Sequence, residues 1–184
     1  VSSGLKAAYF HALKNETQSA RKYLKRIKDA IDGNGNHRHK AELWLRYGNV
    51  YEAENNNDSA LYCFDRAIEL SDNSKPYEQV GMLLSKGNLL YKNGHPDKCI
   101  EILNKALRIA GRKKIIYQTS EIFGRIADCH NSLGNYWQTT RMMLICKNFE
   151  DSIHSSSRER ALNMLRIRDE VLLHQIIIQK QRTA

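Results

Sequence analysis

The chain lacks features that define whole classes of protein. It has two prolines and ten glycines among 184 residues, too few for a collagenous or low-complexity chain. Its apolar stretches at 171–173 and 176–178 are interrupted by His174 and Gln175, and no run reaches the roughly 18 residues that a membrane-spanning helix needs. We therefore predict a soluble helical segment that contains no membrane span.

Neither the cysteines nor the histidines form a metal-binding pattern. Four cysteines occur, none in a C-x-x-C pair: Cys63, Cys99, Cys129 and Cys146. We predict that they are small core residues rather than zinc ligands or disulfides. His37 and His39 alternate without a cysteine or a carboxylate cluster beside them, which is more typical of a solvated turn than of a metal site.

Signatures of catalysis are also missing. The glycine-rich segment from Gly33 to Asn36 follows no strand pattern and does not continue as G-K-[ST], so it does not predict a phosphate-binding loop. The motifs H-E-x-x-H and G-x-S-x-G do not occur. We predict no enzymatic activity, no metal and no cofactor.

The charge is basic and partly clustered. The formal net charge is +9, from 29 basic and 20 acidic residues. The clusters consist of Arg21, Lys22, Lys25, Arg26 and Lys28, and of Lys105, Arg108, Arg112, Lys113 and Lys114. Basic patches attract phosphates or acidic partners, but lysine is also common on solvated helical faces, and no aromatic residues interleave to stack bases. Nucleic-acid binding is therefore the weaker interpretation.

Four stretches repeat at a step of about forty residues. The copies start at residues 1, 41, 80 and 120, which are 40, 39 and 40 residues apart. The clearest copy carries Trp44, Tyr47, Gly48, Tyr51, Ala60, Phe64 and Ala67. The next carries Leu83, Gly87, Leu90, Cys99, Leu103 and Ala106 in the same columns. The first and fourth copies are degenerate, and Met143 takes the column of Phe64 in the fourth.

These columns resemble the tetratricopeptide repeat family, whose pattern is a Trp, a Leu-Gly pair and a Tyr, then Ala, Phe and Ala. The resemblance implies an all-α, right-handed superhelical solenoid of about four antiparallel helix hairpins. We expect an array over 1–150, with repeats near 1–40, 41–79, 80–119 and 120–150. The steps exceed the usual length of about 34 residues, so we expect extended connecting turns at 32–37, 71–75 and 110–114.

Residues 151–184 predict a long closing helix. No proline or glycine interrupts the segment after the serines at 155–157, and Leu165, Leu172 and Ile176 form an apolar stripe. We expect its first half to cap the fourth copy and its second half to act as a connector. Self-association through this helix is an open alternative.

The resemblance also implies a concave groove, lined by the first helix of each hairpin. Carried over by repeat position, its partner-binding residues are Arg46, Asn49, Glu52, Asn88, Tyr91, Arg125, Asp128 and Asn131. Asparagine amides can form hydrogen bonds with a peptide backbone, and arginines can form ion pairs with carboxylates. The alternative is that these residues only form a solvated polar surface. Family members that bind the terminal carboxylate of chaperone tails carry a lysine at position 5 of the first repeat. In this chain, position 5 is leucine in the first three copies: Leu5, Leu45 and Leu84. Chaperone tails are therefore not the expected ligand.

We thus predict a non-catalytic interaction scaffold that binds a protein or peptide and no small-molecule substrate. The repeats, the Phe149–Ser152 segment and the long final helix are similar to the sensory parts of bacterial membrane-bound signalling regulators. That resemblance implies a cytoplasmic or periplasmic part of a larger protein, with a membrane span following it. A free-standing adaptor or co-chaperone-like protein is the alternative.

Overall fold

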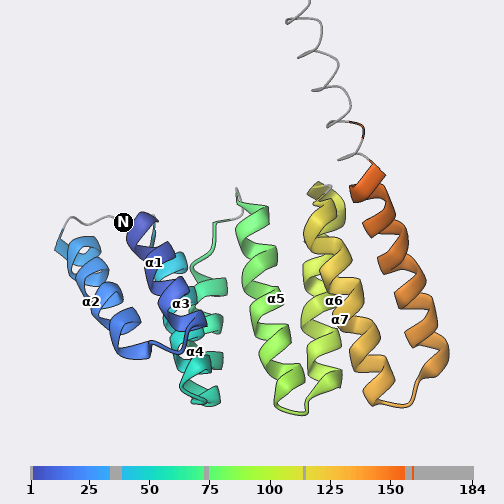
Figure 1. Cartoon of the computed structure of the whole chain (residues 1–184), viewed down its shortest axis with the longest axis horizontal. Coiled ribbons are helices and arrows are strands. Elements are labelled where there is room, and N and C mark those ends of the chain that lie inside the picture. Colours follow the sequence, from blue (N-terminus) through green and yellow to red (C-terminus); the bar gives the residue numbers. More distant parts are fainter. Residues whose placement is uncertain (1, 34–38, 73–74, 114, 156–158, 160–184) are drawn as a thin grey trace, which may run out of the picture.

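The fold is entirely helical in the part of the chain that the structure describes. The structure is a computed structural model, and it describes residues 2–33, 39–72, 75–113, 115–155 and 159. Its elements are α1 (Ser2–Leu13), α2 (Thr17–Gly33), α3 (Lys40–Ala53), α4 (Asn57–Glu69), α5 (Pro76–Lys92), α6 (Pro96–Lys113) and α7 (Ile116–Ser132). Residues 136–155 form one more helix, called the final helix below (Figure 1).

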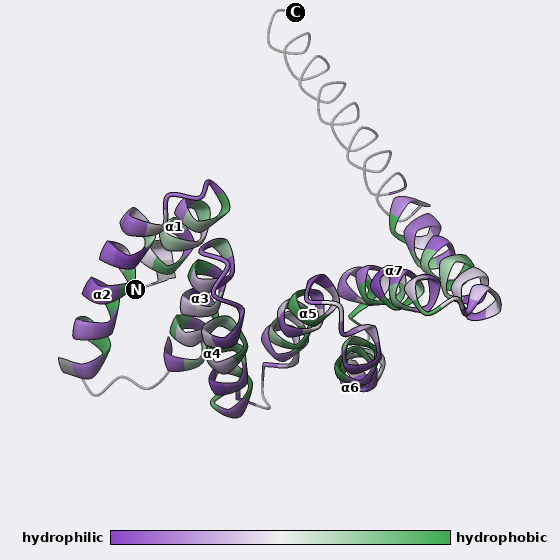
Figure 2. Cartoon of the chain, turned by 90° about the horizontal axis from the view of Figure 1, so that it is seen from below, coloured by the Kyte–Doolittle hydropathy of each residue, from purple (hydrophilic) through white to green (hydrophobic). Residues whose placement is uncertain are grey.

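The helices pair into hairpins that stack along one axis. Each of α1, α3, α5 and α7 is followed by a partner that runs back beside it (Figure 1). Seen from below, α1, α3, α5 and α7 follow the inner side of an arc, and α2, α4 and α6 lie on its outer side (Figure 2). This arrangement confirms the predicted all-α solenoid.

The four turns inside the hairpins share one geometry. Each contains a residue with positive φ, at 58°, 58°, 76° and 73° for Asn15, Asn55, Gly94 and Gly134 in turn. Glycine and asparagine adopt this left-handed conformation at the lowest cost. In each turn the following N–H donates to a carbonyl five residues back, at 2.9 Å in all four cases. These turns are spaced like the repeat starts, which supports the predicted register.

Close helix crossings explain why small residues recur at the same position in successive repeats. A Cβ at Gly48 would overlap the ring of Phe64, and a Cβ at Gly87 would lie 2.7 Å from Cδ2 of Leu103. Both large side chains are fully buried. Phe64 also packs against Leu89 of the next hairpin. Phe64 is thus covered from two sides.

The fourth hairpin departs from this pattern. Met143, which takes the column of Phe64, is 52% exposed, whereas Phe64 is fully buried. In the described part of the chain no hairpin follows to cover its outer side. In addition, Ala127 already carries a Cβ where Gly48 has none. The close approach lies one turn away, where a Cβ on Gly124 would be 3.6 Å from Sγ of Cys146.

The extra residues of each repeat are only partly in connecting turns. Residues 70–72 and 75, between α4 and α5, are non-helical, as expected. However, α6 continues to Lys113 and α2 to Gly33, so the turn predicted at 110–114 is largely wrong. Ala106 and Ala110 are both fully buried, and this stripe at a spacing of four residues makes continued helix favourable.

The predicted closing helix lies mostly outside the described residues. Residues 151–155 continue the final helix without a break, so that helix runs across the boundary that we predict at 150/151. Leu165, Leu172 and Ile176 belong to the part that the structure does not describe. Of the described helices, none combines the length and the apolar character that crossing a membrane requires.

Candidate protein-interaction surfaces

The predicted groove residues lie on three helices of the inner side of the arc. They are Arg46, Asn49 and Glu52 on α3, Asn88 and Tyr91 on α5, and Arg125, Asp128 and Asn131 on α7. A spacing of three residues keeps each set on one side of its helix. We call this set, together with its neighbours on the same helices, the inner surface.

Arg125 organises the inner surface between α5 and α7. Its Nε donates to Oδ1 of Asn88 at 2.8 Å, and its Nη1 donates to Oδ2 of Asp128 at 3.0 Å. The guanidinium lies 5.0 Å from the centre of the Tyr91 ring, a favourable cation–π distance. Tyr91 Oη lies 3.3 Å from Oγ of Ser132. The structure thus brings four of the predicted residues into one network.

A second arginine joins α1 and α3 in a similar way. The guanidinium of Arg46 lies 4.8 Å from the ring centre of Tyr9, and its Nη2 donates to Oε1 of Glu42 at 3.3 Å. Its Nε is buried and has no partner among the described residues. Arg46 therefore has one buried donor without a hydrogen bond, and its charge is compensated by Glu42.

Between these two clusters, one ion pair joins α3 to α5. Lys92 of α5 forms an ion pair with Glu52 of α3. By contrast, Asn49 is half-buried and its amide has no hydrogen-bond partner in the described part of the chain. Asn131 is exposed. Four of the eight predicted groove residues thus contact one another, two pair with other residues, and the Asn49 amide is free.

Sequence reasoning missed some partners in these pairs, although the repeat step contains them. Lys92 follows Glu52 by 40 residues, and Ser132 follows Tyr91 by 41. Residues one step apart lie on neighbouring first helices, so polar residues at that separation are candidates for contact. The step therefore predicts contacts as well as repeat boundaries.

The outer side of the array carries a cleft of about 840 Å³. It lies between α2 and α4, and α3 forms its floor. Its lining residues are Lys28, Asp32, Lys40, Leu43, Trp44, Tyr47, Tyr51, Asp58, Ser59, Tyr62, Cys63, Arg66 and Leu70. We call it the outer cleft.

Aromatic rings dominate the middle of the outer cleft. Trp44 and Tyr62 meet edge to face with ring centres 5.9 Å apart, and Trp44 and Tyr47 are 6.3 Å apart. Tyr62 is 58% exposed. Burial raises the pKa of Tyr47. Such rings offer a large apolar contact area that remains open to a ligand.

An ion pair fixes α2 to α3 beside the outer cleft. Nε of Arg21 donates to Oε1 of Glu54 at 2.8 Å, and Nη2 donates to Oε2 at 2.5 Å. The guanidinium also lies 4.7 Å from the ring centre of Tyr51. This hydrogen-bonded pairing raises the pKa of Arg21 and lowers the pKa of Glu54. One member of the predicted basic cluster is therefore structural.

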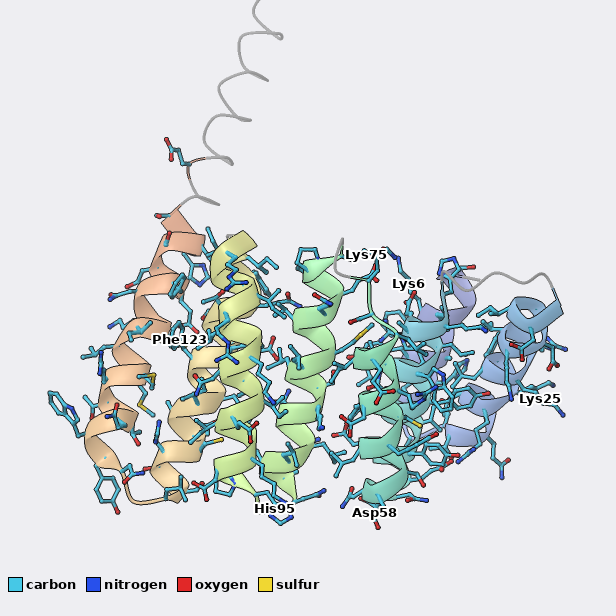
Figure 3. The ribbon with its side chains drawn as sticks, turned by 180° about the vertical axis from the view of Figure 1, so that it is seen from behind. Lys6, Lys25, Asp58, Lys75, His95 and Phe123 are labelled. Atoms are coloured by element: carbon cyan, nitrogen blue, oxygen red, sulfur yellow. The ribbon has the colours of Figure 1, made fainter. Side chains whose placement is uncertain are left out.

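The remaining basic residues of α2 face outward. Lys22, Lys25, Arg26 and Lys28 are exposed, and Lys25 points away from the array (Figure 3). Beside Lys22 and Arg26, the exposed Tyr23 stacks on His11 with ring centres 5.3 Å apart. They give this side of α2 a positive surface.

The cysteines behave largely as predicted. Cys63, Cys99 and Cys129 are buried free thiols, whereas Cys146 is half-buried. Burial raises the pKa of Cys63 to about 11. Over the described ranges, no three His, Cys, Asp or Glu side chains group as metal ligands would.

Comparison with known proteins identifies the repeats. Two models of the tetratricopeptide repeat match the chain, one over residues 41–74 and the other over residues 80–112. These are the two copies with the clearest columns. The chain therefore contains tetratricopeptide repeats.

Solved structures show the same fold at low identity. The apo form of RapI has a TM-score of 0.73 and 16% identity, over 84% of this chain and 57% of that one. A signal transduction ATPase (STAND) protein from Pyrococcus horikoshii, described as having a tetratricopeptide repeat sensor, has a TM-score of 0.71 and 18% identity, over 84% and 24%. The TPR domain of Arabidopsis FLU has a TM-score of 0.57 and 21% identity, over 65% and 98%.

These similarities are limited in extent. The chain spans 57% of RapI and 24% of the STAND protein. None of the curated proteins compared with the chain matches its sequence.

Proposed function

We propose that the chain is a protein–protein interaction scaffold, a role that tetratricopeptide arrays serve and that the two matching repeats support. We propose that its inner surface binds an extended peptide segment of a partner protein. The observation that carries this proposal is the free amide of Asn49, which lies on the same side of α3 as Arg46 and Glu52, both of which are paired. An amide supplies both the donor and the acceptor that a peptide backbone requires.

The surrounding pairs suit a ligand that carries carboxylates. Arg125 is held in place by Asn88 and Tyr91, and Arg46 by Glu42 and Tyr9. An arginine that is already oriented loses less side-chain entropy when a carboxylate binds. The inner surface is therefore preorganised for an acidic or C-terminal segment.

We further propose that the chain is the sensory or regulatory part of a larger signalling protein. The similarity in fold to the STAND protein with a tetratricopeptide repeat sensor supports this role. A free-standing adaptor is the second candidate. The coding sequence beyond Ala184 distinguishes them, because an output domain supports the first and an immediate stop codon supports the second.

Photo-crosslinking tests the binding surface. A benzophenone amino acid placed at Asn49 in the full-length protein should capture a partner in cells, whereas the same group at exposed Lys25 on α2 should not capture that partner. Mass spectrometry then identifies the crosslinked segment. Capture of the same partner from both positions would contradict binding on the inner surface.

The identified partner allows a quantitative measurement. Asn49→Ala should weaken its binding by about threefold to tenfold, since one net hydrogen bond contributes about 0.5 to 1.5 kcal/mol. The melting temperature should hardly change, because substitutions of this kind at the surface shift stability by under about 0.5 kcal/mol. Equal affinity of wild type and variant in calorimetry would exclude the Asn49 amide from the site.

A further inference from the structure

The outer cleft lies on the side of α3 opposite the inner surface. Lys40, Trp44, Tyr47 and Tyr51 are spaced by four, three and four residues, so they form one stripe on α3, and all four line the cleft. Asn49 is five residues from Trp44, which places it about 140° around the helix. A ligand in the outer cleft would therefore not touch the groove residues.

The cleft is long enough for several side chains of a ligand. From Lys40 to Tyr51 the rise along α3 is about 16 Å, equivalent to about three helical turns. Its volume of about 840 Å³ lies within the range of ligand sites in proteins. The rings of Trp44, Tyr47 and Tyr62 form its central contact area.

The two ends of the outer cleft differ in charge. Because successive helices are antiparallel, the first turn of α3 lies beside the last turns of α2 and α4. That end carries three bases and one acid: Lys28, Lys40, Arg66 and Asp32. The other end carries Asp58 and Ser59. Asp58 lies at the turn end of its hairpin, the same end of the array as His95 (Figure 3).

Two of the three bases at this end are unpaired in the described part of the chain. The third, Arg66, pairs through Nη1 with Glu69 at 2.6 Å. Neither Lys28 nor Lys40 forms an ion pair with a described residue. The exposed bases of α2 extend the positive potential beyond the cleft, which favours an acidic partner.

We infer that the outer cleft is a second protein-interaction site, which binds an amphipathic helix with an acidic end. Apolar side chains of that helix lie on the Trp44, Tyr47 and Tyr62 rings, in the helix-in-groove mode. Its acidic end lies against Lys28, Lys40 and Arg66, so the charge difference along the cleft sets the direction of the bound helix. The site shares no lining residue with the inner surface.

Selection of peptides from a random display library tests this inference. The probe is a library of 12-residue peptides selected on the wild-type chain, with the double variant Tyr62→Ala, Lys40→Glu as counter-target. We expect selected peptides to carry an apolar helical stripe and acidic residues near one end. Failure to obtain any peptide that prefers the wild type, or preference for basic peptides, would overturn the proposal.

Single variants locate the selected peptide. In fluorescence anisotropy, Tyr62→Ala should weaken binding by about tenfold or more, as expected for a tyrosine anchor. Lys28→Glu, at an exposed position, should also weaken it, whereas the matched charge reversal Lys25→Glu, outside the lining, should have less effect. Equal effects of the two reversals would indicate only non-specific attraction and would contradict a built site.

A fluorescence readout separates this site from the inner surface. The chain has two tryptophans, so Trp137→Phe leaves Trp44 as the only reporter, and Trp137 is 77% exposed. A peptide in the outer cleft should shift Trp44 emission and should still bind the Asn49→Ala variant unchanged. Loss of binding in Asn49→Ala without a Trp44 response would assign the peptide to the inner surface.

Discussion

The second and fourth hairpins show how the same repeat column can have opposite environments. Phe64 in the second is fully buried, whereas Met143 in the fourth is 52% exposed. Phe64 is covered by its own first helix and by Leu89 of the next hairpin. Met143 has no such neighbour in the described part of the chain. Burial in a solenoid is therefore a property of adjacent repeats, not of one repeat alone.

The largest expected effect comes from truncating the two residues of this column. Phe64→Ala should lower the free energy of unfolding by about 3 to 5 kcal/mol, as for other buried aromatic residues. Met143→Ala should lower it by about 0.5 kcal/mol or less. Chemical denaturation of both variants measures the difference, and similar losses would show that the two positions are equally buried.

Two glycine substitutions should change the stability by smaller amounts and in opposite directions. Gly48→Ala should destabilise by about 1 to 3 kcal/mol, because its Cβ would overlap the fully buried Phe64 ring. Gly124→Ala should be neutral or stabilise by up to about 1 kcal/mol, since its Cβ would make an ordinary contact with Cys146 and alanine is the better helix former. Thermal unfolding compares the two, and destabilisation of both would contradict the looser crossing in the fourth hairpin.

The cysteines of the same hairpins should differ in reactivity. At pH 8, a thiol reagent should modify half-buried Cys146 before buried Cys63, whose pKa burial raises to about 11. Cys63 is protonated in the folded state while the unfolded thiol ionises near pH 9. Its contribution to stability is therefore complete below pH 9 and decreases as pH rises from about 9 to 11.

Cys63→Ala provides the control for this pH dependence. The variant should lose less stability than the wild type between pH 9 and pH 11, when both are measured by denaturant unfolding. Mass spectrometry after limited labelling gives the order of modification. Faster labelling of Cys63 than of Cys146 would show that the second hairpin opens more readily than the fourth.

The repeat register could be predicted from the sequence because it depends on local requirements. Gly48 and Gly87 are needed wherever a large side chain crosses closely, and a turn with positive φ requires residues such as Asn55 or Gly94. These needs recur at each step and leave a periodic pattern. The exposure of Met143 could not be predicted, since it depends on what packs beyond the hairpin.

The candidate surfaces were predictable to different degrees. The step of about forty residues placed Asn88, Tyr91 and Arg125 on neighbouring helices, but it did not show that Arg125 binds the other two. The outer cleft was not predicted, because Trp44 and Tyr47 occupy columns that also occur in the core. Only the separation of α2 from α4 leaves their rings accessible.

Helix α3 carries Trp44 on one side and Asn49 on the other, so the same helix contributes to both surfaces. A tilt or rotation of α3 that is favoured by a ligand on one surface therefore changes the geometry of the other surface. Thermodynamic linkage then requires the effect to be mutual: whatever factor the first occupant imposes on the affinity of the second, the second imposes on the first. An array of this kind can report the arrival of one protein to another without any contact between them.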